Sequence, residues 1–424
     1  MKILIKNARV IDPANNLDDI RDILIEDAKI SKVAQDINEP ADEVIFAKDK
    51  IVLPGVVDMH VHLREPGRED KETIASGTSS ALKGGVTTVL AMPNTTPCID
   101  CPRSVKLLKE IINRTAKTDV FICAAITKDR QGDVLNDIAG LRQAGAIAIS
   151  DDGASVDSDE ILLTAFKKAK KENILVICHC EDKTLSRGGS VNLGFTSTRM
   201  GLKGISKESE YKRVERDIRL AEKAGASLHI AHISCKESVE IIAAAKKRGV
   251  RVTAETAPHY FTFSDEAVLG YDTNLKMNPP LRGKEDLDAI RQGLRTGVID
   301  VIASDHAPHT ENEKDIEFER AEFGVIGLET ILSVSITELV HSGVLTWLEL
   351  VKRLSLNPAG ILKIRKGTLC VGADADIILL DPQKEWVLNK VDIVSKSKNS
   401  PFLGKKLKGR VELTIRAGNI AYKL

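Results

Sequence analysis

Eight short runs of β-branched and apolar residues, separated by segments of helical periodicity, dominate the middle of this 424-residue chain. Strands that alternate with helices form parallel sheets, because each helix returns the chain to the start of the next strand. Eight such units predict an α/β fold, a (β/α)₈ barrel of the TIM type rather than an open sheet. The runs are Val56–Leu63, Thr87–Met92, Val120–Ile126, Ala146–Ser150, Ile174–Cys180, Leu228–Ile233, Val250–Glu255 and Val298–Ala303.

The two ends of the chain lack long helical segments. Near the N-terminus, MKILIKNARVID and DILIEDAKISKV have alternating or β-branched character, and Ala375–Leu380 and Val411–Ala417 resemble them near the C-terminus. Turns rich in Asn, Asp and Gly separate these runs. We therefore expect residues 1–54 and 366–424 to pair into one small β-rich domain, and residues 55–365 to form the barrel. Four helices of the barrel are expected at Ser104–Thr115, Glu160–Glu172, Glu210–Ala224 and Lys236–Arg248.

The composition excludes several classes of function. Lys and Arg total 61 and are balanced by 61 Asp and Glu, so the basic excess of a nucleic-acid-binding protein is missing. No apolar run approaches the roughly 18 to 20 residues of a membrane helix, and the first residues become polar too soon for a signal peptide. The seven cysteines are odd in number and lie in apolar strings, which suits reduced thiols. We expect a cytoplasmic protein with neither nucleic-acid nor membrane partners.

Polar residues gather where the predicted strands end. Active sites of such barrels lie at the C-terminal ends of the strands. His60 and His62 end the first strand and, being two apart, point to the same side. The ends of the fifth, sixth and eighth strands are marked by His179, His232 and Asp305. Four of only nine histidines therefore converge with a carboxylate. Imidazole and carboxylate are the ligands that zinc prefers, so the pattern predicts a metal site at the barrel mouth.

The His-x-His pair after the first strand and the Ser-Asp-His sequence after the last resemble the amidohydrolase superfamily. More narrowly, eight motifs in order resemble the type I, bacterial-style dihydroorotases over the whole barrel. A lone His-x-His pair is common by chance, but eight ordered motifs are not. The motifs are DMHVHLREPG (58–67), AMPNT (91–95), SDDG (150–153), HCED (179–182), AHIS (231–234), KMNPPLR (276–282), ASDHAPH (303–309) and FGVIGLET (323–330).

The resemblance implies zinc as the cofactor, with one or two ions per subunit. It also implies that Asp305 is the general acid/base, which moves a proton between metal-bound water and the ring nitrogen of the substrate. One metal would be held by His60, His62 and Asp305, a second by His179 and His232, and Asp152 would lie between them. The substrate would be held by His62, Arg64, Asn94, Asn278, His309, Phe323 and Gly324, with the Arg64 guanidinium able to grip a carboxylate through two bonds.

The implied reaction is the reversible hydrolysis of the cyclic amide of (S)-dihydroorotate to N-carbamoyl-L-aspartate by metal-bound hydroxide, the third step of de novo pyrimidine biosynthesis. A hydantoinase or allantoinase type of cyclic amidase is an alternative, from which Arg64 and Asn94 distinguish the chain because simple hydantoins lack a ring-borne carboxylate. A second alternative is an inactive scaffold for aspartate transcarbamoylase, which conflicts with the retained metal ligands. A homodimer and an association with aspartate transcarbamoylase, ordering a mobile segment at Thr310–Glu322, are hypotheses for assembly.

The sequence also indicates how the two metal positions are joined. Many relatives use a carboxylated lysine as the bridge, but no lysine occurs here between Lys128 and Lys167, an interval that covers the fourth strand and its following loop. Asp152 is therefore expected to provide the bridge, and activity is expected not to depend on bicarbonate. Because its arm is shorter, the metal of His179 and His232 is expected to be the more labile.

Some polar residues near these motifs are interpreted as structural. Asp151 alternates in direction with Asp152 and is expected to accept hydrogen bonds or cap a turn. His229 lies three residues before His232 and is expected to point toward the surrounding helices. Cys98 and Cys101 have metal-site spacing but no second pair, so we interpret them as ordinary thiols.

Overall fold

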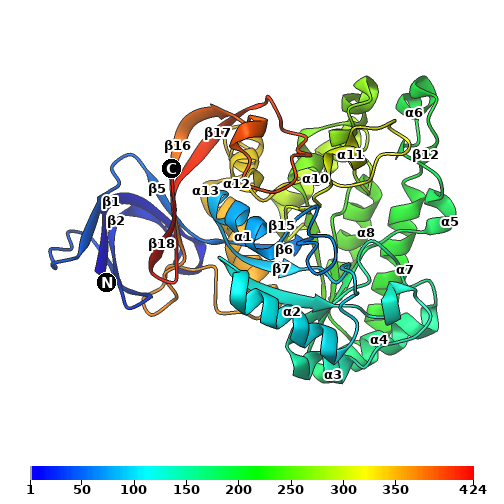
Figure 1. Cartoon of the computed structure of the whole chain (residues 1–424), viewed down its shortest axis with the longest axis horizontal. Helices are drawn as coiled ribbons and strands as arrows, with labels where there is room; N and C mark the ends of the chain where they lie inside the picture. The colour runs from blue at the N-terminus through cyan, green and yellow to red at the C-terminus, as the bar shows by residue number, and fades with distance from the viewer. Residues whose placement is uncertain (1) are drawn as a thin grey trace.

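The computed structural model describes residues 2–424, and a barrel of eight parallel strands forms its centre (Figure 1). Each barrel strand pairs in parallel with the preceding strand of the barrel. The last strand returns to the first, because His62 N donates to His306 O at 2.8 Å and Val61 bridges to His306. The prediction of a barrel is confirmed. Its strands are β6 (Val56–Val61), β7 (Val86–Ala91), β8 (Asp119–Ala124), β9 (Ala146–Ile149), β10 (Leu175–Cys178), β13 (Leu228–Ile230), β14 (Val252–Thr256) and β15 (Val301–Ile302).

Helices surround the barrel, and local signals explain where they begin and end. In α4, the Ser158 side chain accepts from Ile161 N at the start, and Asn173 in the left-handed region ends the helix. The four expected helices are present, with ends within two residues of the prediction. The helices are α1 (Ile74–Lys83), α2 (Pro102–Thr115), α3 (Ile138–Ala144), α4 (Asp159–Glu172), α7 (Glu208–Ala224), α8 (Lys236–Lys247), α10 (Lys284–Thr296), α12 (Ile331–Ser335), α13 (Trp347–Val351) and α14 (Asn357–Leu362).

The barrel interior is apolar below its mouth. Inward-facing side chains of the strands, among them Met59, Leu90 and Ile177, form a buried cluster that Ala359 and Leu362 of α14 close at one end. Outward-facing side chains pack against the helices in a separate, larger cluster. The polar residues at the strand ends therefore sit above a packed apolar core.

Strands from both chain termini form the second sheet, as expected. β5 pairs with β16 in antiparallel register and so joins the two ends of the chain. The expected strand DILIEDAKISKV is two strands, because the chain reverses at Asp27 and Ala28, both with positive φ. The strands are β1 (Lys2–Asp12), β2 (Leu17–Glu26), β3 (Lys29–Ala34), β4 (Glu43–Phe46), β5 (Ile51–Pro54), β16 (Ile377–Val387), β17 (Lys406–Arg416) and β18 (Asn419–Lys423). The boundaries after residues 54 and 365 stay a prediction.

Short elements lie around the barrel, and three of them, α5, α6 and β12, lie on the side away from the terminal sheet (Figure 1). They belong to the loops that follow the barrel strands and so surround the mouth. No helix within residues 2–424 has the length and apolar character needed to cross a membrane. The short elements are α5 (Lys183–Ser186), β11 (Val191–Asn192), α6 (Phe195–Met200), β12 (Gly204–Ile205), α9 (Pro258–Thr262) and α11 (Glu311–Lys314).

Candidate metal centre

Two buried histidines from β6 meet a carboxylate that follows β15. The Oδ1 atom of Asp305 lies 3.4 Å from His62 Nε2 and 3.7 Å from His60 Nε2. Two ligands bonded at about 2.1 Å to one tetrahedral zinc ion lie about 3.4 Å apart. The three side chains are therefore spaced as ligands of a single cation.

A second group lies on the other side of Asp152. His179 Nδ1 and His232 Nε2 are 2.9 Å apart, and Asp152 Oδ1 lies 3.7 Å and 3.6 Å from these two atoms. The same carboxylate reaches the first group, with Oδ1 3.3 Å from His60 Nε2 and Oδ2 3.5 Å from His62 Nε2. Asp152 thus stands between two potential cation positions.

The donor atoms themselves indicate a fit to metal ions. His60 Nε2 and Asp152 Oδ1 are buried and accept or donate no hydrogen bond within residues 2–424. A buried polar atom without a partner costs free energy, and such atoms are rare in folded proteins. A cation between them would satisfy both. The residues present therefore fit the metal that the sequence predicts.

Three of the four histidines are oriented by an acceptor on their other ring nitrogen. Such a partner fixes the tautomer and leaves the opposite nitrogen free for a metal. This arrangement makes Glu255, Asn94 and Glu181 supports of the site rather than ligands. The pairs are His60 Nδ1 with Glu255 at 2.6 Å, His62 Nδ1 with Asn94 at 2.8 Å, and His179 Nε2 with Glu181 at 3.1 Å.

Both carboxylates of the cluster are held in the ionised form. Burial alone would raise the pKa of Asp305, but the hydrogen bond with His62 and the charges of the imidazoles lower it to about 2. Burial also acts to raise the pKa of Asp152, but the charge of His60 and the neighbouring imidazoles outweigh it and place that pKa well below its usual value. Ionised oxygens are the form that coordinates a cation.

The backbone at the site departs from regular strand geometry. Positive φ angles occur at Arg64 (62°), His232 (30°) and Asp305 (48°), although none of these residues is glycine. Such conformations cost of order 1–3 kcal/mol each and cluster at functional sites. Here they turn the chain at the ends of β6, β13 and β15, so that these side chains face the mouth.

The Arg64 side chain lies partly buried beside the cluster, with no acidic group of the described chain at ion-pair distance. Its Nε donates to Pro308 O at 3.1 Å and its Nη2 lies 3.3 Å from His309 Nε2, but within residues 2–424 it forms no ion pair. Burial lowers its pKa to about 10. A guanidinium without an ion pair can bind a carboxylate ligand through two N–H donors.

The remaining predicted substrate residues lie around the same mouth. Asn278 and Phe323 line a cavity of about 450 Å³ together with Glu181, the partner of His179. His309 Nε2 donates to Phe323 O at 2.9 Å. A Cβ on Gly324, where φ is 134°, would lie 2.8 Å from Ala307 Cβ, so only glycine fits there.

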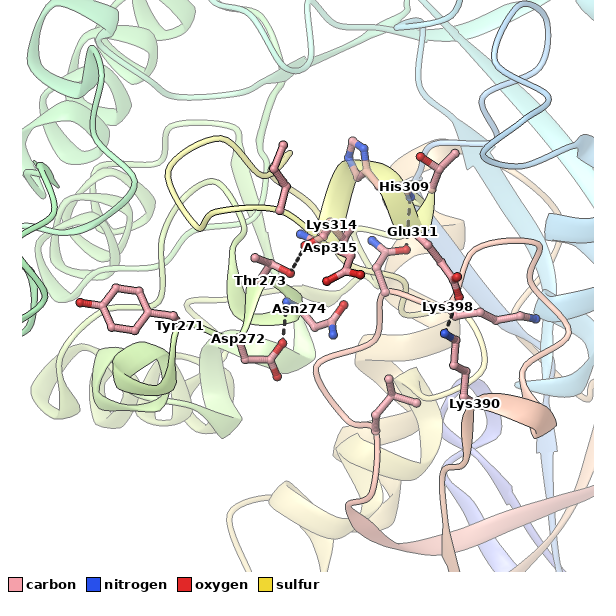
Figure 2. A pocket seen from close by; sticks show the side chains of 14 residues that line it. Tyr271, Asp272, Thr273, Asn274, His309, Glu311, Lys314, Asp315, Lys390 and Lys398 are labelled. Carbon is pink, nitrogen blue, oxygen red and sulfur yellow. Dashed lines mark hydrogen bonds and ion pairs between the residues drawn. The ribbon is translucent and has the colours of Figure 1, made fainter.

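His309 also lines an outer cavity of about 410 Å³ (Figure 2). Its Nδ1 accepts from Lys71 Nζ at 3.0 Å. Burial and the nearby charges of Arg64 and Lys71 lower the pKa of His309 to about 2. The ring is therefore neutral and acts as a hydrogen-bond donor to the backbone.

One sequence-based expectation near the site is wrong. His229 faces the barrel interior, where its Nδ1 is 2.8 Å from Thr253 Oγ1 and its Nε2 is 3.1 Å from Glu255 Oε2. Regular alternation ends with β13 at Ile230, so counting three residues to His232 does not give opposite sides. By contrast, Asp151 accepts from Ile126 N and Thr127 N, as its structural interpretation requires.

Glu255 and Glu181 were not among the predicted site residues. Glu255 is the last residue of the expected seventh strand, and Glu181 lies in the HCED motif beside His179. Both could have been found by asking which strand-end carboxylates can accept from a ligand histidine.

Solved structures with the same architecture cover nearly the whole chain. An L-hydantoinase (dihydropyrimidinase) from Arthrobacter aurescens has a TM-score of 0.90 at 26% identity, covering 99% of this chain and 95% of that one. A D-hydantoinase (dihydropyrimidinase) from a Thermus species has a TM-score of 0.85 at 25% identity, covering 100% and 96%. With the cluster of histidines and carboxylates, this fold defines a metal-dependent cyclic amidohydrolase.

Comparison with sequence relatives shows to which family of cyclic amidohydrolases the chain belongs. A family model described as Dihydro-orotase-like matches residues 49–238. A dihydroorotase from Elusimicrobium minutum is 52% identical over 420 residues, covering 99% of this chain and 97% of the relative. One from Syntrophus aciditrophicus is 49% identical over 428 residues, with both chains fully covered. The chain belongs to the dihydroorotase family.

Proposed function

We propose that this chain catalyses the reversible hydrolysis of (S)-dihydroorotate to N-carbamoyl-L-aspartate in pyrimidine biosynthesis. The observation that carries the proposal is the partly buried Arg64 guanidinium, which lies beside the metal cluster and forms no ion pair with the described residues. Dihydroorotate bears a ring carboxylate that this guanidinium can bind through two N–H donors. The full-length relatives named dihydroorotase support the same substrate.

The metal would be zinc, with one or two ions per subunit. His60, His62 and Asp305 would hold one ion, His179 and His232 would hold the other, and Asp152 would contact both. Bound there, zinc would polarise the ring carbonyl and lower the pKa of water so that it can attack near neutral pH.

The protein residues then divide the remaining tasks. Arg64 binds the substrate carboxylate through two N–H donors, and Asn278 with the Phe323–Gly324 backbone holds the ring. Asp305 accepts the proton of the attacking water and delivers it to the ring nitrogen as the carbon–nitrogen bond breaks. In ring closure Asp305 takes the proton from the ureido nitrogen instead, so one carboxylate serves both directions.

A matched pair of substrates tests the proposal. Dihydrouracil is dihydroorotate without the carboxylate, and it is a substrate of the dihydropyrimidinase type. We expect zinc in the purified protein and a kcat/KM for dihydroorotate far above that for dihydrouracil. Equal values, or a preference for dihydrouracil or hydantoin, would assign the chain to the hydantoinase type instead.

The assembly and location of the protein are further proposals. We propose a cytoplasmic homodimer that associates with aspartate transcarbamoylase through the region of Thr310–Glu322. Size-exclusion chromatography of the two proteins, alone and mixed, tests the association. Separate elution with full activity of the isolated chain would exclude a required partner.

A further inference from the structure

Two buried lysines join the loops that carry the proposed substrate residues. Lys276 precedes Asn278 in the loop between α9 and α10, whereas Lys314 ends α11 in the long loop that follows β15. Neither lysine is a proposed ligand or substrate contact. Both side chains are almost fully buried, which is uncommon for lysine and calls for a specific set of partners.

The Lys276 ammonium donates hydrogen bonds to the backbone at one end of the long loop. Its Nζ donates to the backbone carbonyls of Phe318 at 2.8 Å, Glu319 at 2.9 Å and Ala321 at 2.6 Å. It also lies 4.4 Å from the centroid of the Phe323 ring, within the range of a cation–π contact. Lys276 therefore contacts both the backbone of the long loop and the ring of Phe323, a predicted substrate residue.

The Lys314 ammonium ties the same segment from the other side. Its Nζ donates to the carbonyls of Lys276 at 3.3 Å, Glu322 at 2.8 Å and Gly324 at 3.0 Å. In return, Gly324 N donates to Lys276 O at 3.0 Å. Figure 2 shows Lys314 beside Thr273, whose hydroxyl donates to the Lys314 carbonyl. The Glu322–Gly324 backbone is thus fixed to the loop that carries Asn278.

All six acceptors are backbone carbonyls, and this determines what the lysines can do. An ammonium has three N–H donors, so each lysine uses its full capacity on the main chain. Burial lowers the pKa of Lys276 to about 8 and, with the charge of Lys276 added, that of Lys314 to about 7. Three carbonyls around each amine oppose that shift, because only the charged form donates to all three.

We propose that Lys276 and Lys314 are positioning residues, which set the Phe323–Gly324 backbone and Asn278 at the correct separation for the substrate. The inference rests on the proposed function. Because the two lysines act on groups that bind the ring before and during the reaction, their loss should weaken substrate binding more than it slows the chemical step. The metal cluster lies on other strand ends and should keep its ions.

A graded series of substitutions tests this role. Lys276→Met and Lys314→Met remove all donors, whereas Lys276→Gln and Lys314→Gln keep two N–H groups. We expect the methionine variants to raise KM for dihydroorotate at least about tenfold, within the roughly 10²-fold that a misplacement of about 1 Å can cost. The expected kcat changes less than KM, zinc content is unchanged, and the glutamine variants fall between.

Arg353→Met is the matched control. Arg353 is a buried cation that also serves backbone carbonyls, donating to Glu349 O at 2.9 Å and to Leu294 O, but it lies among the helices that follow the barrel. Its loss should lower the melting temperature without raising KM. An unchanged KM in all four lysine variants, or an equal rise in Arg353→Met, would overturn the proposal.

Hydrogen exchange separates this inference from the proposed reaction. The Gly324 amide should exchange faster in Lys276→Met and Lys314→Met than in the wild type or Arg353→Met. If the wild type does not act on dihydroorotate, the proposed function fails, yet the exchange rates still show whether the lysines hold the loop. Unchanged exchange at Gly324 in folded lysine variants would contradict the proposal that the lysines position this loop.

Discussion

The barrel mouth and the terminal sheet differ in whether their polar side chains have partners within the chain. Beside the terminal sheet, Lys366 Nζ lies 2.6 Å from Asp119, 2.9 Å from Asp374 and 2.7 Å from Asp376. At the mouth, His60 Nε2 and Asp152 Oδ1 are buried without a hydrogen-bond partner in the described chain.

The difference distinguishes charged groups that stabilise the fold through ion pairs, such as Lys366, from polar groups that are available to bind a ligand, such as His60 and Asp152. A cation surrounded by three carboxylates is satisfied within the chain, and these neighbours raise the pKa of Lys366. Buried polar atoms that form no hydrogen bond reduce stability unless something else binds them. Substitutions in the two regions should therefore have separable effects, on activity at the mouth and on stability beside the sheet.

The largest effect is expected for Asp305→Asn at the mouth. Asparagine keeps the shape but can neither accept the proton nor carry the negative charge. Turnover should fall by at least the roughly 10²-fold typical of a lost general acid/base, while circular dichroism shows a folded barrel. Near-normal turnover in this variant would exclude Asp305 from the chemistry.

Arg64→Met should separate two substrates. The variant loses the cation that faces the carboxylate, which is expected to cost about 2–3 kcal/mol in transition-state binding of dihydroorotate. Most of this loss should appear as a raised KM. The already low kcat/KM for dihydrouracil should change little. Equal losses on both substrates would mean that Arg64 shapes the whole site rather than binding one group.

Lys366→Met tests the other half of the comparison. Three carboxylates lose their shared cation, so the free energy of unfolding should fall by about 1–3 kcal/mol, a range reduced because the acids are partly exposed. Thermal unfolding measures the change. The kcat and KM of the folded variant should match the wild type, and a selective loss of activity would break the proposed separation.

The smallest effect is expected for the double variant Cys98→Ser and Cys101→Ser. Burial raises the pKa of Cys98 to about 12, so this thiol is protonated and poorly suited to bind a metal. Zinc content by mass spectrometry should be unchanged. Loss of an ion would reveal a second metal site outside the mouth.

The sequence predicts the barrel and the positions of the proposed ligands well, because both depend on local patterns. Strand-end position and alternation place His60 and His62 on one side, and the structure brings them to Asp305. The same rule fails for His229, since alternation stops where β13 ends. Local patterns hold only while the backbone is regular.

Contacts made by irregular segments could not be predicted in this way. Lys276 reaches carbonyls more than forty residues ahead in the chain, at Phe318 and Glu319. No periodicity specifies such a pairing, because it depends on how two loops fold over the mouth. The support of His60 by Glu255 is intermediate, since strand ends place both residues at the mouth but do not show their contact.

We propose that Asp152, rather than a carboxylated lysine, joins the two halves of the metal site. Reconstitution of the apoprotein with zinc in buffer free of carbon dioxide tests it directly, with bound zinc and dihydroorotate hydrolysis measured together. We predict full activity without bicarbonate, with the metal of His60 and His62 retained more firmly than that of His179 and His232. Protein that binds zinc but stays inactive until bicarbonate is added would contradict the assignment of Asp152.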